Sequence, residues 1–237
     1  MAEPTGSAAD GLVGMLNVFI DPAETAKRIP SKGFWIWPMV TLTIVYVIFG
    51  YLMLPYTTQM VDNRMTQQFS ASNAPPEQVE RAQRIAHIMT QVGIPLAPVF
   101  IIIFLAIFAG LVLGMCSVVG IKTKFRDLFS LLAVCSLIAM LQYIATFIVL
   151  RAKGDEITSA EQLTPAFGLD IFAQGLHGVA LAFLNFFSVF EIWYIIILGL
   201  TLAALTGASK GKAFIASSPA WVVPLLFRLV GAAFTKS

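Results

Sequence analysis

The chain has 237 residues, of which 58% are hydrophobic and only 12% are charged. Soluble domains carry about 25% charged residues, so this composition excludes an ordinary soluble domain. The mean hydropathy of +0.83 indicates a membrane protein instead. The formal net charge of +2 is too small and too scattered to favour a nucleic-acid-binding protein. The length suits one bundle of membrane-spanning helices.

Residues 1–33 are predicted to form an N-terminal cytoplasmic or interfacial segment. Its apolar stretch, residues 11–20, is too short to cross a membrane. Asp21 then supplies an N-cap, Pro22 suits the first helical position, and Glu24 completes a capping box. The pattern predicts a short helix that runs through Arg28.

Residues 34–237 are predicted to form a domain of five transmembrane helices, which makes the fold an all-α polytopic membrane bundle. The five spans are expected near residues 34–56, 94–119, 128–150, 185–213 and 214–234. Residues 57–92 are polar and are predicted to form a helical extramembrane lobe. Pro95 and Pro98 are expected in the first turns of the second span, where proline does least harm. Pro219 and Pro224 predict that the last span is kinked or begins late.

Residues 166–184 combine an apolar background with a polar stripe. Asp170, Gln174 and His177 recur at positions i, i+4 and i+7, a spacing that places them on one face of a helix. This pattern is typical of a helix that lies in the membrane interface, or of a re-entrant segment. We interpret the stripe as a wetted helix face rather than a binding site.

The short connections between the predicted spans carry many of the positive charges. These residues are Lys122, Lys124 and Arg126 in one turn, and Lys210 and Lys212 in another. Because short cytoplasmic loops are enriched in Lys and Arg, we predict a cytoplasmic N-terminus and an external C-terminus. The same five residues are candidate contacts for anionic lipids of the inner leaflet. The alternative is that they only fix the topology.

Glu191 is the main candidate for chemistry inside the membrane. An ionisable group within a span costs about 2.5–3.5 kcal/mol on insertion scales and therefore asks for an explanation. One interpretation is a contact with a proton, an ion, a ligand or a partner. The other is structural, with the carboxylate at headgroup depth, capping a helix or bridging two helices. The candidate partners for such a bridge are Arg228, Gln142 and Asn185.

Three stretches of the sequence resemble the Yip1 family, and its bacterial branch most closely. They are FIDPAETAKRIPSKGFWIWPM at 19–39, KTKFRD at 122–127 and FEIWYIIILGLTLAALTGASKGKA at 190–213. The resemblance extends from Val18 to Ala232. It implies a five-helix fold with a cytosolic N-terminus and a role in membrane organisation or trafficking through binding partners. It also implies a location in the bacterial inner membrane.

Three hypotheses for the function follow. The first is a non-enzymatic scaffold or trafficking factor that contacts the lipid bilayer, other membrane proteins or further copies of this chain. The second is a small transporter or permease component that uses Glu191, Arg228 and Gln142 within the bundle. The third is a membrane enzyme, which requires Asp170, His177 and Glu191 to meet at one pocket. The sequence has no catalytic or metal-binding motif, so we predict no enzymatic activity, no cofactor and no nucleic-acid partner.

Overall fold

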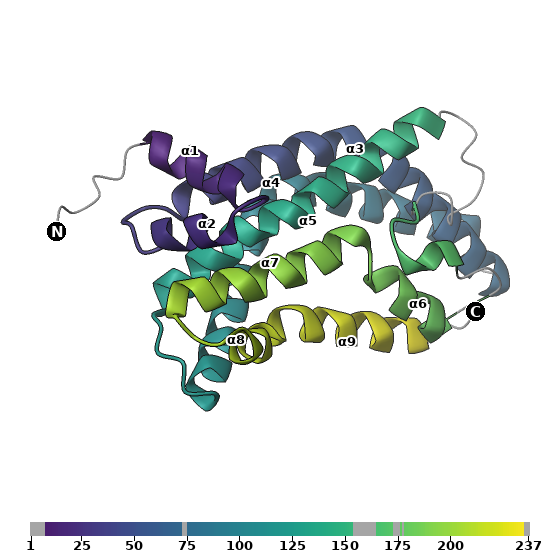
Figure 1. Ribbon diagram of the computed structural model, residues 1–237. Helices are drawn as coiled ribbons and strands as arrows, with labels where there is room; N and C mark the ends of the chain where they lie inside the picture. Colours follow the sequence, from purple (N-terminus) through teal and green to yellow (C-terminus); the bar gives the residue numbers. More distant parts are fainter. Residues whose placement is uncertain (1–7, 73–74, 154–164, 173–175, 177, 235–237) are drawn as a thin grey trace. The chain divides into compact units, whose positions relative to one another are not determined.

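The computed structural model describes residues 8–72, 75–153, 165–172, 176 and 178–234. These residues form helices and no strands, apart from one isolated bridge between Gly168 and Ser188 (Figure 1). Four of the described helices are long and apolar enough to cross a membrane, and a bent helix pair would make a fifth. They are α3 (Ile36–Ser72), α4 (Pro76–Val118), α5 (Phe125–Lys153), α7 (Val189–Thr206) and the pair of α8 (Lys210–Ser217) with α9 (Pro219–Phe234). The predicted all-α membrane bundle is therefore confirmed.

The chain groups into two compact units. Unit 1 comprises Met1–Leu42, Ile102–Leu141 and Ala166–Ser237, and unit 2 comprises Thr43–Ile101 and Gln142–Pro165. The three longest helices, α3, α4 and α5, each contribute residues to both units. All candidate site residues except Gln142 belong to unit 1.

The N-terminal part of unit 1 consists of two short helices, α1 (Ala8–Asn17) and α2 (Pro22–Arg28). The Asp21 carboxylate accepts a hydrogen bond from the Glu24 N–H at 3.0 Å, which confirms the predicted cap and the end at Arg28. Helix α2 packs against α7 (Figure 1). Thr25 is fully buried, and its hydroxyl donates to the Asp21 carbonyl at 3.2 Å. The cytoplasmic segment of the sequence prediction is thus anchored on a spanning helix.

Glu24 gives this N-terminal part a dependence on pH. Its carboxylate pairs with Lys27 at 2.9 Å and with Arg28 at 3.4 Å. The hydrogen bond from Lys27 is the main cause that lowers the pKa of Glu24. A lowered carboxyl pKa stabilises the fold above the pKa of the unfolded chain, and that stabilisation is lost as the pH falls through the folded value.

We therefore expect Glu24→Gln to lower the melting temperature at pH 7 and to have little effect at pH 3. The measurement is a thermal melt of the detergent-solubilised protein at both values. Glu77→Gln is the control, because Glu77 is exposed and forms no ion pair among the described residues. A loss of the same size at both pH values would contradict the role assigned to the carboxylate.

Helix α7 is shorter than the predicted span. Its 18 residues rise about 27 Å at 1.5 Å per residue, so the single helix predicted over residues 185–213 is wrong at both ends. Ser188 caps the start, and Gly207, with φ of +68°, ends the helix in the left-handed conformation that favours glycine. Helix α8 then begins separately and packs against α7. Gly199 permits this packing, since a Cβ there would lie 2.6 Å from the Phe214 ring.

The last span is broken, as the prolines predicted. Helices α8 and α9 meet at an angle of 41° directly before Pro219, whereas Pro224 lies inside α9. Helix α9 packs against α6 (Gly178–Phe186), which follows the short 3-10 helix η3 (Leu169–Phe172). The nine residues of α6 rise about 13.5 Å, too little to cross a hydrocarbon core of roughly 30 Å. Gln174 and His177 of the predicted polar stripe lie outside the described residues, as does the side chain of Asp170.

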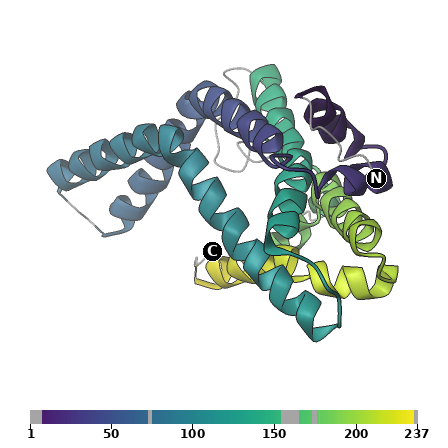
Figure 2. The ribbon, with the colours of Figure 1, turned by 90° about the vertical axis from the view of Figure 1, so that its left-hand side faces the viewer.

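In unit 2 the polar segment 57–92 is not a set of separate helices. Helix α3 continues to Ser72, and α4 begins at Pro76, so the segment consists of extensions of the two spanning helices, which lie side by side (Figure 2). The His87 and Asp62 side chains join the two extensions at 2.8 Å.

Pro95 and Pro98 lie deep inside α4, and the expectation that they begin a helix is wrong. The helix begins instead at Pro76, whose missing N–H costs nothing at the first position. Prolines in the interior of membrane helices are tolerated because neighbouring groups satisfy the carbonyls that they free.

Candidate functional site

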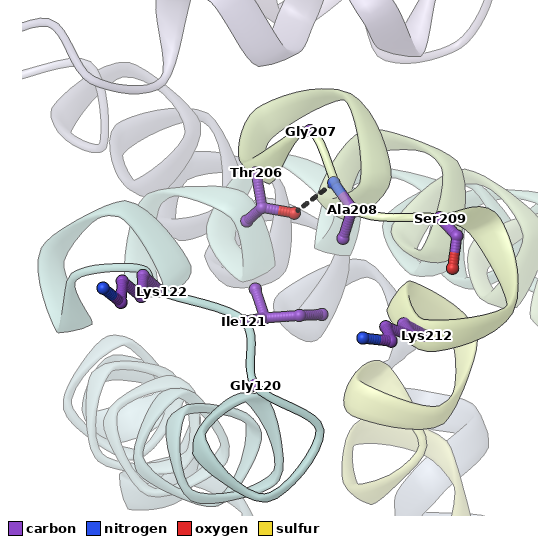
Figure 3. A pocket seen from close by; sticks show the side chains of 8 residues that line it. All are labelled: Gly120, Ile121, Lys122, Thr206, Gly207, Ala208, Ser209 and Lys212. Atoms are coloured by element: carbon purple, nitrogen blue, oxygen red, sulfur yellow. Dashed lines mark hydrogen bonds between the residues drawn. The ribbon is translucent and has the colours of Figure 1, made fainter.

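A cavity lies at one end of unit 1, between the turn that joins α4 to α5 and the turn that joins α7 to α8. Its volume is about 500 Å³. Its walls consist of Gly120, Ile121, Lys122, Thr206, Gly207, Ala208, Ser209 and Lys212 (Figure 3). Two basic turns that are 90 positions apart in the sequence therefore meet at one cavity.

Left-handed glycines form both turns. Helix α4 ends at Val118. Gly120, two residues later, has φ of +75°, and the Ile121 N–H donates back to the Cys116 carbonyl at 2.7 Å. Helix α7 ends at Gly207 in the same conformation, and the next N–H, of Ala208, donates to the Thr206 hydroxyl at 3.4 Å (Figure 3). Because the chain reverses its direction directly after each of these two spans, the lysines that follow remain close to the ends of the spans.

Lys122 and Lys212 are the charged residues of the cavity, and both are exposed. Figure 3 shows the Lys212 ammonium turned toward Ile121, whereas the Lys122 ammonium points away from it. In the part of the chain that the structure describes, neither lysine forms an ion pair. No carboxylate among the described residues therefore pairs with them.

The other three basic candidates do not line the cavity. Lys124 and Lys210 are exposed, and each is a near neighbour in sequence of residues that line the cavity. The Arg126 guanidinium is engaged, because it donates to the Pro30 carbonyl and lies 3.5 Å from the Asp127 carboxylate. Arg126 thus ties the start of α5 to the connection between α2 and α3.

Glu191 lies in the first turn of α7, where its role is in part structural. Its backbone N–H donates to the Ser188 hydroxyl at 3.1 Å. In a capping box Ser at the N-cap is followed three residues later by Glu, and a carboxylate is favourable beside a helix N-terminus. Ser188 was not predicted as the N-cap, although the spacing Ser-x-x-Glu from Ser188 to Glu191 indicates a capping box. The cap supports the structural interpretation of Glu191 without excluding a contact of its carboxylate.

Arg228 joins α9 to α6 through the main chain. Its guanidinium donates to the Asn185 carbonyl at 3.4 Å. Of the four residues predicted to share intramembrane contacts, Arg228 and Asn185 are joined by this hydrogen bond, and Glu191 as their partner stays a prediction. Gln142, the fourth, lies in α5 within unit 2, where its carbonyl accepts from the Thr146 hydroxyl at 2.9 Å.

Comparison with known proteins adds a family to this geometry. The family profile described as Yip1 domain matches residues 16–232. No curated protein and no solved structure matches the chain. The matched region includes both basic turns, the first turn of α7 and Arg228, so every candidate residue lies within it.

Proposed function

This chain belongs to the Yip1 family, and from that membership we propose that it is a non-enzymatic scaffold or trafficking-type protein. It acts through contacts with other membrane proteins and with anionic lipids. The match over residues 16–232 carries the proposal, because it extends over almost the whole chain. The Yip1 family is a family of membrane proteins that are not known as enzymes.

The chain is an integral, multi-pass membrane protein, and its lipid-facing surface is extensive. The middle of α4 exposes Val99, Phe100, Ile103, Phe104 and Ile107, each by 45% or more. Soluble monomers rarely expose such a continuous apolar surface, whereas acyl chains cover it without cost. Contact with the bilayer follows from this exposure.

The proposal places the N-terminus and the two basic turns in the cytoplasm of a bacterial cell, with the spans in its inner membrane. The concentration of Lys and Arg in the two turns supports this orientation. The stretches that resemble the bacterial branch of the family support the location. In this orientation Lys122, Lys124, Lys210, Lys212 and the partly engaged Arg126 face the anionic inner leaflet.

The test is native mass spectrometry of the protein released from membranes with minimal detergent. We expect a specific copurifying membrane protein, further copies of the chain, or anionic lipid. The lipid component should decrease when Lys122, Lys124, Lys210 and Lys212 are all replaced by Gln, because each lysine near an anionic surface contributes about 1 kcal/mol. Neutral phosphatidylcholine added in parallel controls for lipid that binds the apolar surface without regard to charge.

A transporter is the second candidate, because Glu191 in α7 and Arg228 in α9 are ionisable residues within predicted spans of unit 1. Ionisable residues inside a membrane commonly mark the path of a substrate or an ion. A bound small molecule that is lost in Glu191→Gln would overturn the scaffold proposal in favour of transport. The next experiment would then be flux into liposomes.

A further inference from the structure

The cavity between the two basic turns lies at the ends of three spanning helices. Helix α4 ends just before Gly120, α5 begins just after Lys122, and α7 ends just before Gly207. The ends of spanning helices lie near the boundary between hydrocarbon and headgroups. In the orientation proposed above, the cavity therefore faces the depth where the phosphates of lipids are concentrated.

The charge of the cavity wall is positive and unopposed. Lys122 and Lys212 line it from its two sides, and none of the residues that line it is acidic. Flexible lysine stems let both ammonium groups move toward an anion between them. The Lys212 ammonium is already turned toward Ile121, and the Lys122 side chain must rotate to bring its ammonium to the same anion. A few polar groups placed around one concave volume give a site its specificity.

Neutral donors add to the two cations. Ser209 stands at the N-cap position of α8, yet its hydroxyl makes no capping hydrogen bond, and Figure 3 shows this oxygen on the side of Lys212. The first N–H groups of a helix have no acceptor within the helix, and those of α8 begin directly after Ser209. Gly211 leaves open space where a Cβ would otherwise stand. These groups are suited to the oxygens of a phosphate.

We propose that this cavity binds a phosphate group, carried in the membrane by the headgroup of an anionic lipid. The inference deepens the proposed lipid contact and rests on it, because it turns a general attraction into one site with defined residues. A volume of about 500 Å³ exceeds that of a phosphate alone, so the site accepts the glycerol part of a headgroup as well. Lys124 and Lys210 contribute only to the general attraction.

The experiment uses the full chain and two double variants with equal loss of charge. Lys122→Gln with Lys212→Gln removes the cavity lysines, and Lys124→Gln with Lys210→Gln is the matched control. The purified proteins are titrated with phosphatidic acid, and the first bound lipid is followed by native mass spectrometry. At about 1 kcal/mol for each lysine, we expect the affinity to fall about thirtyfold in the cavity variant. The fall in the control should be several times smaller, because Lys124 and Lys210 do not line the cavity. Ser209→Ala should lower the affinity for phosphatidic acid without a change in the charge of the protein.

Inorganic phosphate in the absence of lipid distinguishes the source of the phosphate group. Phosphorus NMR of the native chain should show weak binding that the cavity variant loses and the control keeps. Lysine-dependent binding of inorganic phosphate without binding of phosphatidic acid would assign the site to a soluble phosphate compound and overturn the lipid headgroup.

An equal loss of affinity for phosphatidic acid in the two double variants would overturn the proposal that the cavity is the binding site. The proposal of a general contact with anionic lipid would then still hold. Undiminished binding of phosphatidic acid in both variants would overturn the proposed site in the cavity and also the proposed contact of the lysines with anionic lipid. Circular dichroism of each variant confirms that the exposed substitutions leave the helices intact, so a loss of lipid cannot be ascribed to unfolding.

Discussion

Gly168→Ala is expected to destabilise the protein by about 3 kcal/mol. A Cβ at this position would overlap the Phe187 carbonyl oxygen and lie 2.6 Å from the Ser188 Cα. Both atoms belong to the backbone and cannot rotate away. The close contact between these two backbone segments also includes a hydrogen bond from the Val189 N–H to the Phe167 carbonyl at 3.0 Å. An added methyl group must therefore separate two chain segments rather than one flexible side chain.

The consequence reaches the candidate site, because Ser188 caps the helix that carries Glu191. We expect Gly168→Ala to lower the unfolding midpoint in a titration with sodium dodecyl sulfate and to increase proteolysis before α7. Gly93→Ala is the matched control, since a Cβ at Gly93 in α4 meets nothing within 4 Å. Alanine there should be neutral or stabilise the helix by up to about 1 kcal/mol. Equal midpoints for the two variants would show that the close approach at Gly168 is not a constraint.

The existence of the spans and of the short helix α2 was predictable because their signals are local. The free energy of transferring an apolar segment of about 20 residues into hydrocarbon depends on the residues of that segment, and not on the rest of the chain. The cap of α2 is equally local, because Asp21 and Glu24 lie within one turn. The break before Pro219 follows from the proline itself.

The exact ends of the long helices were not predictable from hydropathy. Before α7 the apolar residues continue without a break in hydropathy, and the helix begins where Ser188 caps it and ends where Gly207 takes the left-handed conformation. At α3 the reverse holds, because the helix continues into polar residues up to Ser72. Hydropathy measures the preference for lipid, whereas helix length also depends on capping and on partners such as Asp62 and His87.

The cavity was the least predictable feature. The sequence identified its two lysines as basic residues in short turns, but nothing local relates Lys122 to Lys212. Their meeting depends on how the helices pack within unit 1. The engagement of Arg126 by Pro30 has the same origin, so five residues of similar charge acquire different roles only in the folded chain.

Leu198→Ala is expected to cost about 2–3 kcal/mol of stability. Leu198 is fully buried in α7, the helix against which both α2 and α8 pack. Lipid is as apolar as leucine, so little of this loss comes from transfer out of water. It comes from the cavity that remains and from the dispersion contacts that its walls lose. The measurement is the unfolding midpoint in the same detergent titration.

Ile196→Ala separates packing from hydrophobicity. Ile196 lies two residues earlier on the same helix, is 44% exposed, and loses the same number of carbon atoms on truncation. Because the side chain faces outward, lipid fills the space that alanine leaves, and the expected loss is below about 1 kcal/mol. Equal losses at both positions would mean that α7 is not packed against the N-terminal helices as described. A larger loss at Leu198 would instead show that close packing, and not hydrophobicity alone, stabilises α7.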